Sequence, residues 1–516
     1  MTEPTFLRDI AEKIERQEID ADATTLAWEI VSLQPDLNVS EQRDAIVLIL
    51  LSLIALAQGS TRVPLERAGV WHTTHLEGLL EDSDNAAAWL VRIHRMNDEK
   101  RLGIILGTPG DAKPLIMDQG CLYHHRTHLY EVRLSEKIRT RLDGAVTAIG
   151  ETLEDVLNRP VVGSKGDVVL DPAQIRAVTI GASHPLAIVT GGPGTGKTSI
   201  VLSILRLLLR HGVVPERIAL AAPTGKAANR LGESIFETQA SIAEPSAADD
   251  LIAEVPRPQT LHRLLQYSKR TGGFAHGEHN PLIQKWIIVD EASMIDLVLM
   301  ERLLSSVGPD SHLVLIGDAE QLPSVDTGTI LRDLVPDLGV DVEHVARLTY
   351  SHRMDASDPA GSAIFAAAQY VREGNAAMLK SNGLKAQKLD SLKFTGAEWI
   401  ALEPDAARQT LFGLFRIWEK RQLAVFPELD QLTSRHVYRV EDGAFRQDDI
   451  DRLNQVFEHL SRSRILCLTR VFDTGAEFAN RFFHRRLAER SGAPSTAAFI
   501  AGTPVLMLHN DYERNL

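Results

Sequence analysis

The feature that most constrains this chain is a glycine-rich stretch between an apolar run and a helical pattern. Residues 186–189 predict a short buried strand, and residues 200–209 have the apolar spacing of a helix. Glycines let the backbone curl so that several N–H groups converge, and the helix N-terminus adds partial positive charge there. This order predicts a site for nucleotide phosphates, with a glycine-rich turn as the alternative. The stretch comprises Gly191, Gly192, Pro193, Gly194, Thr195, Gly196, Lys197, Thr198 and Ser199.

Two side chains of this loop have predicted roles of their own. Lys197 can reach the β- and γ-phosphates of the nucleotide, and the Thr198 hydroxyl can be a ligand of Mg²⁺. The loop therefore predicts both a nucleotide and a divalent cation.

Length, cysteine content and charge restrict the class of protein. A chain of 516 residues is expected to contain two to four domains. Cys121 and Cys467 cannot form a disulfide framework, and the longest apolar run, residues 45–57, is too short to span a bilayer. We therefore expect a cytoplasmic protein without membrane contact. The net charge of −14 argues against a surface that is basic throughout, but local contacts with nucleic acid and a partner subunit remain compatible with it.

The N-terminal part of the chain has mainly helical patterns and no recognisable catalytic motif. We expect residues 1–145 to form a separate, mainly helical domain that also contains a strand at residues 114–117. The predicted helices cover residues 6–16, 23–32, 41–58, 85–93 and 123–142.

The middle of the chain alternates strands and helices, which predicts an α/β domain with a parallel sheet covered on both faces over residues 146–350. Residues 239–259 are interpreted as a surface loop or short helix. In residues 351–516 the signal weakens, and a second α/β layer is predicted. The middle strands are expected at 186–190, 218–222, 286–289 and 313–316; the last part has helices at 360–373 and 477–490 and strands at 464–470 and 503–510.

Two further predicted strands end in polar residues suited to phosphate chemistry. In WIIVDEASM, Asp290 follows an apolar run and is a candidate ligand of Mg²⁺, while Glu291 is the candidate base that positions the attacking water. In LVLIGDAEQLPSVDTG, Gln321 is a candidate sensor of the γ-phosphate. The alternative for this second segment is a polar loop that caps the next helix.

Two more segments begin helices just after strands and are candidates for contacts with a nucleic-acid phosphate. The alternatives are solvated helix caps and, for the histidine, a core side chain. The candidates are Thr224, Gly225 and Lys226 in APTGKAANRL, and Thr260, His262 and Arg263 in QTLHRLL.

The wording and order of these segments resemble a known family. GGPGTGKT, APTGKAANRL, TLHRLL, VDEASM and GDAEQLPSVDTG are similar to motifs I, Ia, Ic, II and III of RecD-type superfamily 1 DNA helicases, the alpha-subunit family of exodeoxyribonuclease V (the RecBCD enzyme). Gln174, in DPAQIRAV, matches the glutamine that reads adenine in this family. Arg353, in RLTYSHRM, matches an arginine on the γ-phosphate, whereas His352 stands where an aromatic residue is usual.

The resemblance implies a RecA-like domain at 146–350 and a partial second one at 351–516, with ATP and Mg²⁺ at their interface. It also implies 5′ to 3′ translocation on single-stranded DNA, action at DNA ends in double-strand break repair by recombination, and docking of residues 1–145 on RecB- and RecC-like subunits. No stretch resembles motifs V and VI, which carry an arginine finger in the family. Because such an arginine stabilises the transition state of phosphoryl transfer, we expect ATP binding with impaired hydrolysis.

Three other functions are considered as alternatives to a helicase. The first is a truncated, ATP-binding scaffold subunit without unwinding activity. The second is a conjugative relaxase–helicase, disfavoured because the N-terminal part lacks a relaxase-type histidine cluster. The third, a nuclease, is disfavoured because no acid–acid–lysine cluster suits two-metal cleavage.

Overall fold

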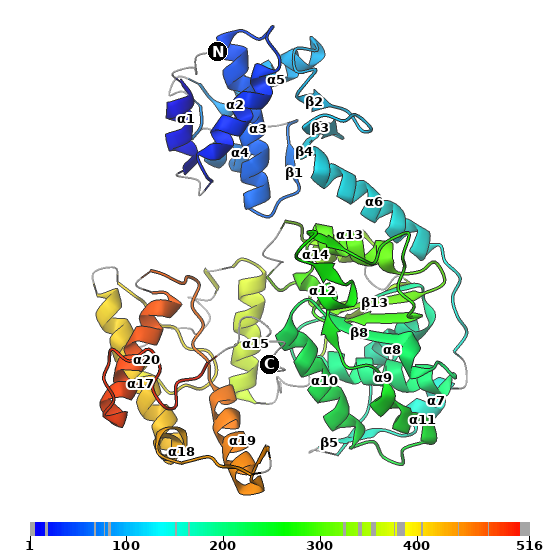
Figure 1. Ribbon diagram of the computed structural model, residues 1–516, viewed down its shortest axis with the longest axis vertical. Helices are drawn as coiled ribbons and strands as arrows, with labels where there is room; N and C mark the ends of the chain where they lie inside the picture. The colour runs from blue at the N-terminus through cyan, green and yellow to red at the C-terminus, as the bar shows by residue number, and fades with distance from the viewer. Residues whose placement is uncertain are drawn as a thin grey trace. The chain divides into compact units, whose positions relative to one another are not determined.

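The computed structural model divides the chain into two compact units, Met1–Asp355 and Ala356–Leu516, which are described separately (Figure 1). The domain boundary predicted at residue 145 stays a prediction. The residues that the structure describes are 6–15, 19–66, 69–76, 78–80, 84–149, 152–163, 166–322, 327–338, 343–351, 358–375, 377–378, 388–403, 406–441, 443–472 and 474–505.

The first unit begins with a lobe of helices around one apolar core, called the N-terminal lobe here (residues 6–124). Its centre is α3 (Val39–Ala57), in which residues 45–51 are all buried. A helix that is apolar on all sides needs cover on all sides, which the other helices and a small sheet supply. The other helices are α1 (Phe6–Glu15), α2 (Asp22–Ser32), α4 (Val70–His75) and α5 (Ala86–Asp98), and the sheet has the order β1 (Arg62–Pro64), β4 (Cys121–His124), β3 (Leu115–Asp118), β2 (Leu106–Gly107).

The lobe is mainly helical, as predicted, but it contains more strand than the sequence indicates. Of its four strands, the sequence predicts only β3. The first residues of the helix expected at 123–142 instead belong to β4, which pairs with β3, and α6 covers His125–Leu142. Short strands of this kind offer too few residues for a clear alternation of apolar and polar side chains.

A six-stranded sheet forms the centre of the rest of this unit, and every adjacent pair of its strands is parallel. Alternate residues of one strand pack into different cores. Ala187 and Val189 contribute to the core with α8 and α9, whereas Leu186 and Ile188 contribute to the core with α6 and α13. The predicted α/β sheet covered on both faces is therefore confirmed. The strand order is β14 (Val345–Leu348), β7 (Leu186–Gly191), β13 (His312–Gly317), β12 (Trp286–Val289), β8 (Ile218–Ala222), β9 (Gln259–Thr260).

The helices around this sheet are α7 (Thr152–Leu157), α8 (Pro172–Ser183), α9 (Lys197–Arg210), α10 (Gly225–Gln239), α11 (Ala247–Asp250), α12 (Leu261–Leu264), α13 (Leu297–Ser306) and α14 (Ile330–Asp337). Two small hairpins accompany them, β5 (Val161–Gly163) with β6 (Gly166–Val168) and β10 (Tyr267–Ser268) with β11 (Gly273–Phe274).

Helix α6 joins the N-terminal lobe to the sheet domain and is anchored by a buried arginine. The Arg141 guanidinium donates hydrogen bonds to the carbonyl oxygens of Val307, Gly308 and Ser311 at 2.6, 3.1 and 2.9 Å. Burial lowers the pKa of Arg141, and the three carbonyls supply acceptors that water would otherwise provide. The end of α6 is thereby fixed to the loop between α13 and β13.

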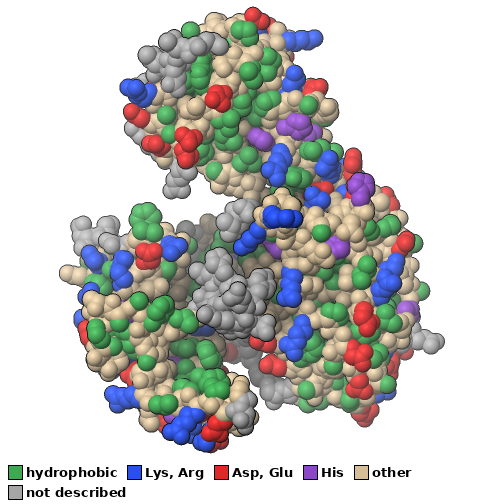
Figure 2. All heavy atoms as spheres, viewed as in Figure 1, with side chains coloured by type: hydrophobic (Ala, Val, Ile, Leu, Met, Phe, Trp, Pro, Cys, Tyr) green, Lys and Arg blue, Asp and Glu red, His purple; other side chains and the backbone are tan. Residues whose placement is uncertain are grey.

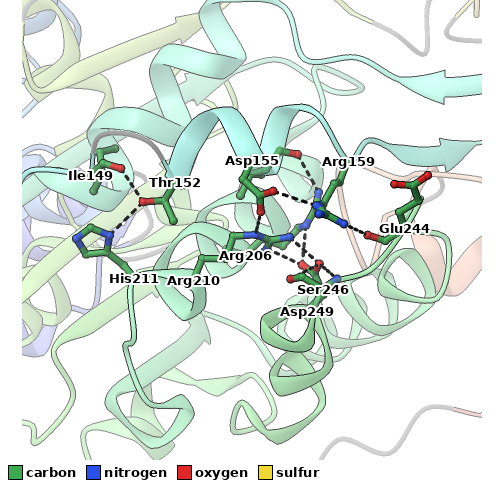
Figure 3. A network of polar contacts seen from close by, with 11 residues as sticks. Ile149, Thr152, Asp155, Arg159, Arg206, Arg210, His211, Glu244, Ser246 and Asp249 are labelled. Carbon is green, nitrogen blue, oxygen red and sulfur yellow. Dashed lines mark hydrogen bonds and ion pairs between the residues drawn. The ribbon is translucent and has the colours of Figure 1, made fainter.

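A second charged network fixes the far end of α9, the helix that starts at Lys197 (Figure 3). Arg206 and Arg210 both bond Asp249 of α11, and Arg210 also bonds Asp155 of α7. The segment 239–259 contains the short helix α11, as one of the two alternatives predicted. It does not lie wholly on the surface, because Asp249 is only 1% exposed and its carboxylate bonds Arg206 of α9.

The second unit is mainly helical around a small cluster of phenylalanines that includes Phe415 and Phe478. The strand predicted at 464–470 is wrong: these residues form no strand, and Leu466 and Leu468 are 91% and 104% exposed. An apolar run becomes a strand only where another strand accepts its hydrogen bonds, and no described residue pairs with this run. A strand is also predicted at 503–510. Residues 503–505 form no strand, and residues 506–510 lie outside the described residues.

The elements of the second unit are α15 (Pro359–Arg372), α17 (Ala407–Val425), α18 (Leu429–Ser434), α19 (Gln447–Arg462), α20 (Ala476–Ser491), β15 (Val440–Glu441) and β16 (Ala444–Phe445). In the described part of the chain, none of the helices combines the length and apolar character needed to cross a bilayer.

Candidate nucleotide and nucleic-acid site

The carboxyl ends of the parallel strands surround a cleft of about 570 Å³. The cleft brings the glycine-rich loop together with both predicted acids and with Gln321, although these come from three separate strands. Helix α10 adds Arg230, which is not among the predicted site residues. The lining residues are Pro193, Gly194, Thr195, Gly196, Lys197, Thr198, Ser199, Ala227, Arg230, Leu231, Ser234, Asp290, Glu291 and Gln321.

The glycine-rich loop has the backbone that its glycines permit. Gly194 and Gly196 have φ of 78° and 82°, in the left-handed region that a residue with a Cβ rarely adopts. At Gly191 a Cβ atom would lie 2.7 Å from the Cβ of Leu348, so this position needs glycine for close packing against β14. The loop follows β7 and opens α9, so the N-terminus of this helix lies at the cleft.

Lys197 and Gln174 hold the loop in this shape. The Lys197 ammonium donates to the Gly191 carbonyl oxygen at 2.8 Å, across the loop. Gln174 is only 2% exposed; its amide donates to the Thr195 carbonyl oxygen at 3.0 Å, and its Oε1 accepts from the Asp171 N–H at 3.0 Å. Gln174 thus supports the loop from the start of α8, and its predicted contact with adenine stays a prediction.

The two acids lie where β12 ends and have different surroundings. Burial raises the pKa of Asp290, even though the Glu291 N–H bonds it at 2.9 Å and Lys197 and Arg230 attract its charged form. A bound cation would stabilise the charged form of such a buried carboxylate and lower its pKa. Glu291 has a left-handed φ of 54°, and its buried Oε2 has no hydrogen-bond partner among the described residues. Strained backbone and an unsatisfied buried oxygen are typical of a site that acts on a bound group.

These residues fit the predicted Mg²⁺. Thr198 and Asp290 line the same cleft and offer a hydroxyl and a carboxylate, which are oxygen ligands of the kind that Mg²⁺ prefers.

The loop that carries Gln321 is tied to the glycine-rich loop at its start. The Ala319 N–H donates to the hydroxyl of Thr190, the residue before Gly191, at 3.1 Å. Gln321 itself is exposed and lines the cleft. Its predicted role as a sensor is therefore compatible with its position.

Arg353 and His352 lie outside the described residues. The neighbouring Ser351 is described, and its hydroxyl donates to the Pro193 carbonyl oxygen at 3.0 Å. The segment that leads to Arg353 therefore reaches the glycine-rich loop.

The candidates for phosphate contacts lie on two adjacent strand ends. Thr224 and Thr260 are the N-caps of α10 and α12, and their hydroxyls accept from the N–H groups of Ala227 and Arg263, each at 3.2 Å. Strands β8 and β9 are parallel neighbours, so the two helix starts lie side by side. The alternative of a helix cap is thus confirmed for both threonines, and a cap leaves the remaining N–H groups of the first turn available.

Lys226, His262 and Arg263 are exposed beside these caps, so His262 is not a core side chain. The His262 ring lies 5.4 Å from the Tyr267 ring and 5.7 Å from the Phe274 ring, on the β10–β11 hairpin. Neither aromatic residue belongs to a predicted site; the glycine pair between them in YSKRTGGF is the available signal for a hairpin.

Charges of both signs are interspersed on the face shown in Figure 2. This agrees with the net charge of −14 and with nucleic-acid contacts that rest on local groups.

Comparison with known proteins agrees with the motifs. A family model described as an AAA domain matches residues 174–327, which contain the glycine-rich loop, both acids and Gln321. The chain is 34% identical over 348 residues to the RecBCD enzyme subunit RecD of Mycolicibacterium smegmatis, covering 66% of this chain and 54% of that protein. It is 35% identical over 248 residues to the ATP-dependent RecD2 DNA helicase of Deinococcus radiodurans, covering 48% of this chain and 30% of that protein.

Solved structures give weaker likenesses. The Pif1 helicase from Candida albicans matches with 19% identity and a TM-score of 0.24, covering 40% of this chain and 45% of that chain. The UvsW helicase from bacteriophage T4 matches with 12% identity and a TM-score of 0.27, covering 38% and 66%. Scores this low carry no weight for the function.

The chain spans about half the length of the first curated relatives, 54% for the protein of Mycolicibacterium smegmatis and 53% for the RecBCD enzyme subunit RecD of Mycobacterium tuberculosis. Within that span, the sequence similarity confirms the resemblance drawn from the motifs. By sequence and by its parallel P-loop sheet, this chain is a relative of the RecD-type superfamily 1 helicases.

Proposed function

We propose that this chain is an ATP-dependent DNA helicase or translocase subunit of a RecBCD-type exodeoxyribonuclease V complex. One observation carries the proposal: a single cleft gathers Lys197, Asp290, Glu291 and Gln321, each predicted independently for a different part of phosphoryl transfer. The similarity to RecD subunits and to a RecD2 helicase supports the choice of DNA as the track.

In this proposal the residues divide the chemistry among them. Lys197 leaves the Gly191 carbonyl and binds the β- and γ-phosphates of ATP. Thr198 and Asp290 hold Mg²⁺, which neutralises phosphate charge when bound. Glu291 orients the attacking water through Oε2, which no other described residue bonds, and Gln321 contacts the γ-phosphate.

Two further contacts with the nucleotide rest on the family resemblance. They are the reading of adenine by Gln174 and the binding of the γ-phosphate by Arg353.

We assign single-stranded DNA to the adjacent starts of α10 and α12. Their first-turn N–H groups and the exposed cations Lys226 and Arg263 suit phosphates, and the His262 ring offers a surface for a base. Loss of one phosphate contact should lower the slope of log affinity against log salt by about 0.7.

The DNA assignment is tested with Lys226→Ala and Arg263→Ala, measured by fluorescence anisotropy over a salt series. Lys285→Ala is the matched control, because Lys285 lies at the opposite, amino end of β12. Equal affinities and slopes for all three variants would contradict the assignment.

The direction of movement and the partners are also part of the proposal. We assign 5′ to 3′ movement on single-stranded DNA, action at DNA ends during double-strand break repair, and docking of residues 1–145 on RecB- and RecC-like subunits. Displacement of a strand from duplexes with a 5′ or a 3′ tail tests the direction, and co-purification with and without residues 1–145 tests the docking.

A scaffold that binds ATP without unwinding would give nucleotide binding with no displacement on either duplex. That result would replace the motor by the scaffold interpretation.

A further inference from the structure

Helix α3 of the N-terminal lobe ends in a tight cap. The cap places the carbonyl groups of Leu56 and Gly59 in contact with residues 327 and 328. The Ser60 N–H bonds the Ala55 carbonyl at 2.8 Å, and the Gly59 N–H bonds the Leu56 carbonyl at 2.9 Å. Gly59 has a φ of 80°, as this type of helix cap requires. The carbonyls of Leu56 and Gly59 lie at the negative end of the helix and are good acceptors.

Both carbonyls accept hydrogen bonds from the end of the loop that carries Gln321. The Thr327 hydroxyl donates to the Leu56 carbonyl oxygen at 3.1 Å, and the Gly328 N–H donates to the Gly59 carbonyl oxygen at 3.1 Å. Gly328 is buried, so water does not compete freely for this bond.

The same two loop residues are also tied to the segment that follows the acids of the cleft. The Leu297 N–H, in the first turn of α13, donates to the Thr327 carbonyl oxygen at 3.1 Å. Gly328 has a φ of 110°, and a Cβ there would lie 3.0 Å from the Leu297 Cβ, so the contact is close. A short turn, Ala292–Met294, connects Glu291 with this helix.

The loop is therefore held at both of its ends, by different parts of the molecule. At its start, the Thr190 hydroxyl ties Ala319 to the strand that leads into the glycine-rich loop. At its end, Thr327 and Gly328 tie it to α3. Thr327 is thus bonded both to α3 and, through Leu297, to the segment that begins at Glu291 of the cleft.

We propose that the end of α3 positions the Gln321 loop, so that the N-terminal lobe and the nucleotide site are coupled through Thr327 and Gly328. Thr327 is the positioning residue, since its side chain reaches α3 while its backbone bonds α13. The proposal rests on the proposed function, in which Gln321 responds to the γ-phosphate. A protein that binds the N-terminal lobe would then alter nucleotide turnover, and the nucleotide would alter the lobe in return.

The test is hydrogen exchange measured by mass spectrometry on the full chain, with and without Mg²⁺ and a non-hydrolysable ATP analogue. We expect the analogue to change exchange at residues 191–199 and, at least about threefold, at residues 55–60 of the lobe. Thr327→Val should keep the change at 191–199 and lose the one at 55–60. Thr327→Ser, which keeps the hydroxyl, should behave as the unaltered chain does.

Thr329→Val is the matched control, because the Thr329 hydroxyl bonds Asp333 of α14 rather than α3. In ATP turnover, Thr327→Val should change KM or kcat about 3- to 10-fold, the size expected for one lost hydrogen bond, and Thr329→Val should not. Unfolding temperatures of both variants check that the fold is intact.

The outcomes separate this proposal from the proposed function. No change at 55–60 in the unaltered chain, with clear protection at 191–199, would overturn the coupling and leave the nucleotide site standing. The coupling is overturned in the same way if Thr327→Val retains the change at 55–60. No protection at 191–199 would overturn the proposed function, and the coupling with it.

Discussion

Replacing Asp249 by asparagine should destabilise the first unit strongly, although the two side chains have almost the same shape. Asp249 is 1% exposed and accepts hydrogen bonds from Arg206 at 2.9 Å and from two nitrogens of Arg210, each at 2.7 Å (Figure 3). Arg206 is itself only 2% exposed. The change therefore leaves a buried cation without its carboxylate, which typically costs about 3–5 kcal/mol.

The pKa of Asp249 shifts in the direction that this network predicts. Burial alone would raise it, but hydrogen bonds from Arg210, the Ser246 N–H and Arg206 outweigh burial and hold the pKa well below its ordinary value. A carboxyl with a depressed folded pKa stabilises the fold above the unfolded pKa, near 3.9, and this stabilisation is lost as pH falls below it. At neutral pH the ionised Asp249 carboxylate therefore makes its full contribution to the free energy of unfolding.

Urea unfolding followed by circular dichroism measures the effect. If the free energy of unfolding falls by ~3 kcal/mol for each molar of urea, a loss of about 3–5 kcal/mol in that free energy lowers the urea concentration at the midpoint by about 1–1.7 M. Asp250→Asn is the matched control, because Asp250 is the exposed neighbour of Asp249 and its replacement should change the free energy of unfolding by less than about 0.5 kcal/mol. Adding Arg206→Met to Asp249→Asn should recover part of the loss, because the unpaired cation is gone. A loss for Asp249→Asn as small as that of Asp250→Asn would refute the reasoning.

Three further outcomes are expected. Glu291→Gln should slow ATP hydrolysis about 10²- to 10⁴-fold with unchanged nucleotide affinity, whereas Glu216→Gln, at an exposed residue before the amino end of β8, should change neither; equal turnover in both would remove Glu291 from its role. Gln174→Ala should destabilise the chain by about 1–3 kcal/mol and weaken nucleotide binding, because the buried Thr195 carbonyl and the half-buried Asp171 N–H lose these hydrogen bonds; an unchanged unfolding midpoint speaks against this. Unfolding temperature should fall as pH drops below about 6.5, because burial lowers the folded pKa of His184 and His312 and the unfolded chain binds more protons; a flat profile between pH 7 and 5 contradicts it.

The sheet could be predicted from the sequence because its central strands are short apolar runs that end in glycine or acids. The runs before Gly191, Asp290 and Asp318 all form buried parallel strands, and their carboxyl ends meet at one edge. The cleft follows from that topology. Its main residues can therefore be chosen from the sequence alone.

Other parts depend on partners that no local pattern reveals. Strand β9 has two residues and exists because Gln259 and Thr260 pair with β8. The run at 464–470 has a strand-like composition but no strand beside it among the described residues. In both cases, pairing with another segment decides the structure, and composition does not.

The same holds for two features of the site. Arg230 lies in the segment APTGKAANRL, one helical turn beyond Lys226 on α10, but it lines the nucleotide cleft, which Lys226 does not. The bond between Thr327 and α3 joins positions 271 residues apart, and nothing near either residue in the sequence indicates it.

Hydrolysis of ATP by this chain, with and without single-stranded DNA, tests the central claim most directly. A motor built on this cleft predicts turnover that rises when DNA is added and that Lys197→Ala abolishes, because the lysine no longer reaches the phosphates. Turnover that is the same in Lys197→Ala would contradict the assignment of the cleft. Nucleotide binding without DNA-stimulated turnover would contradict the motor and leave only a nucleotide-binding subunit.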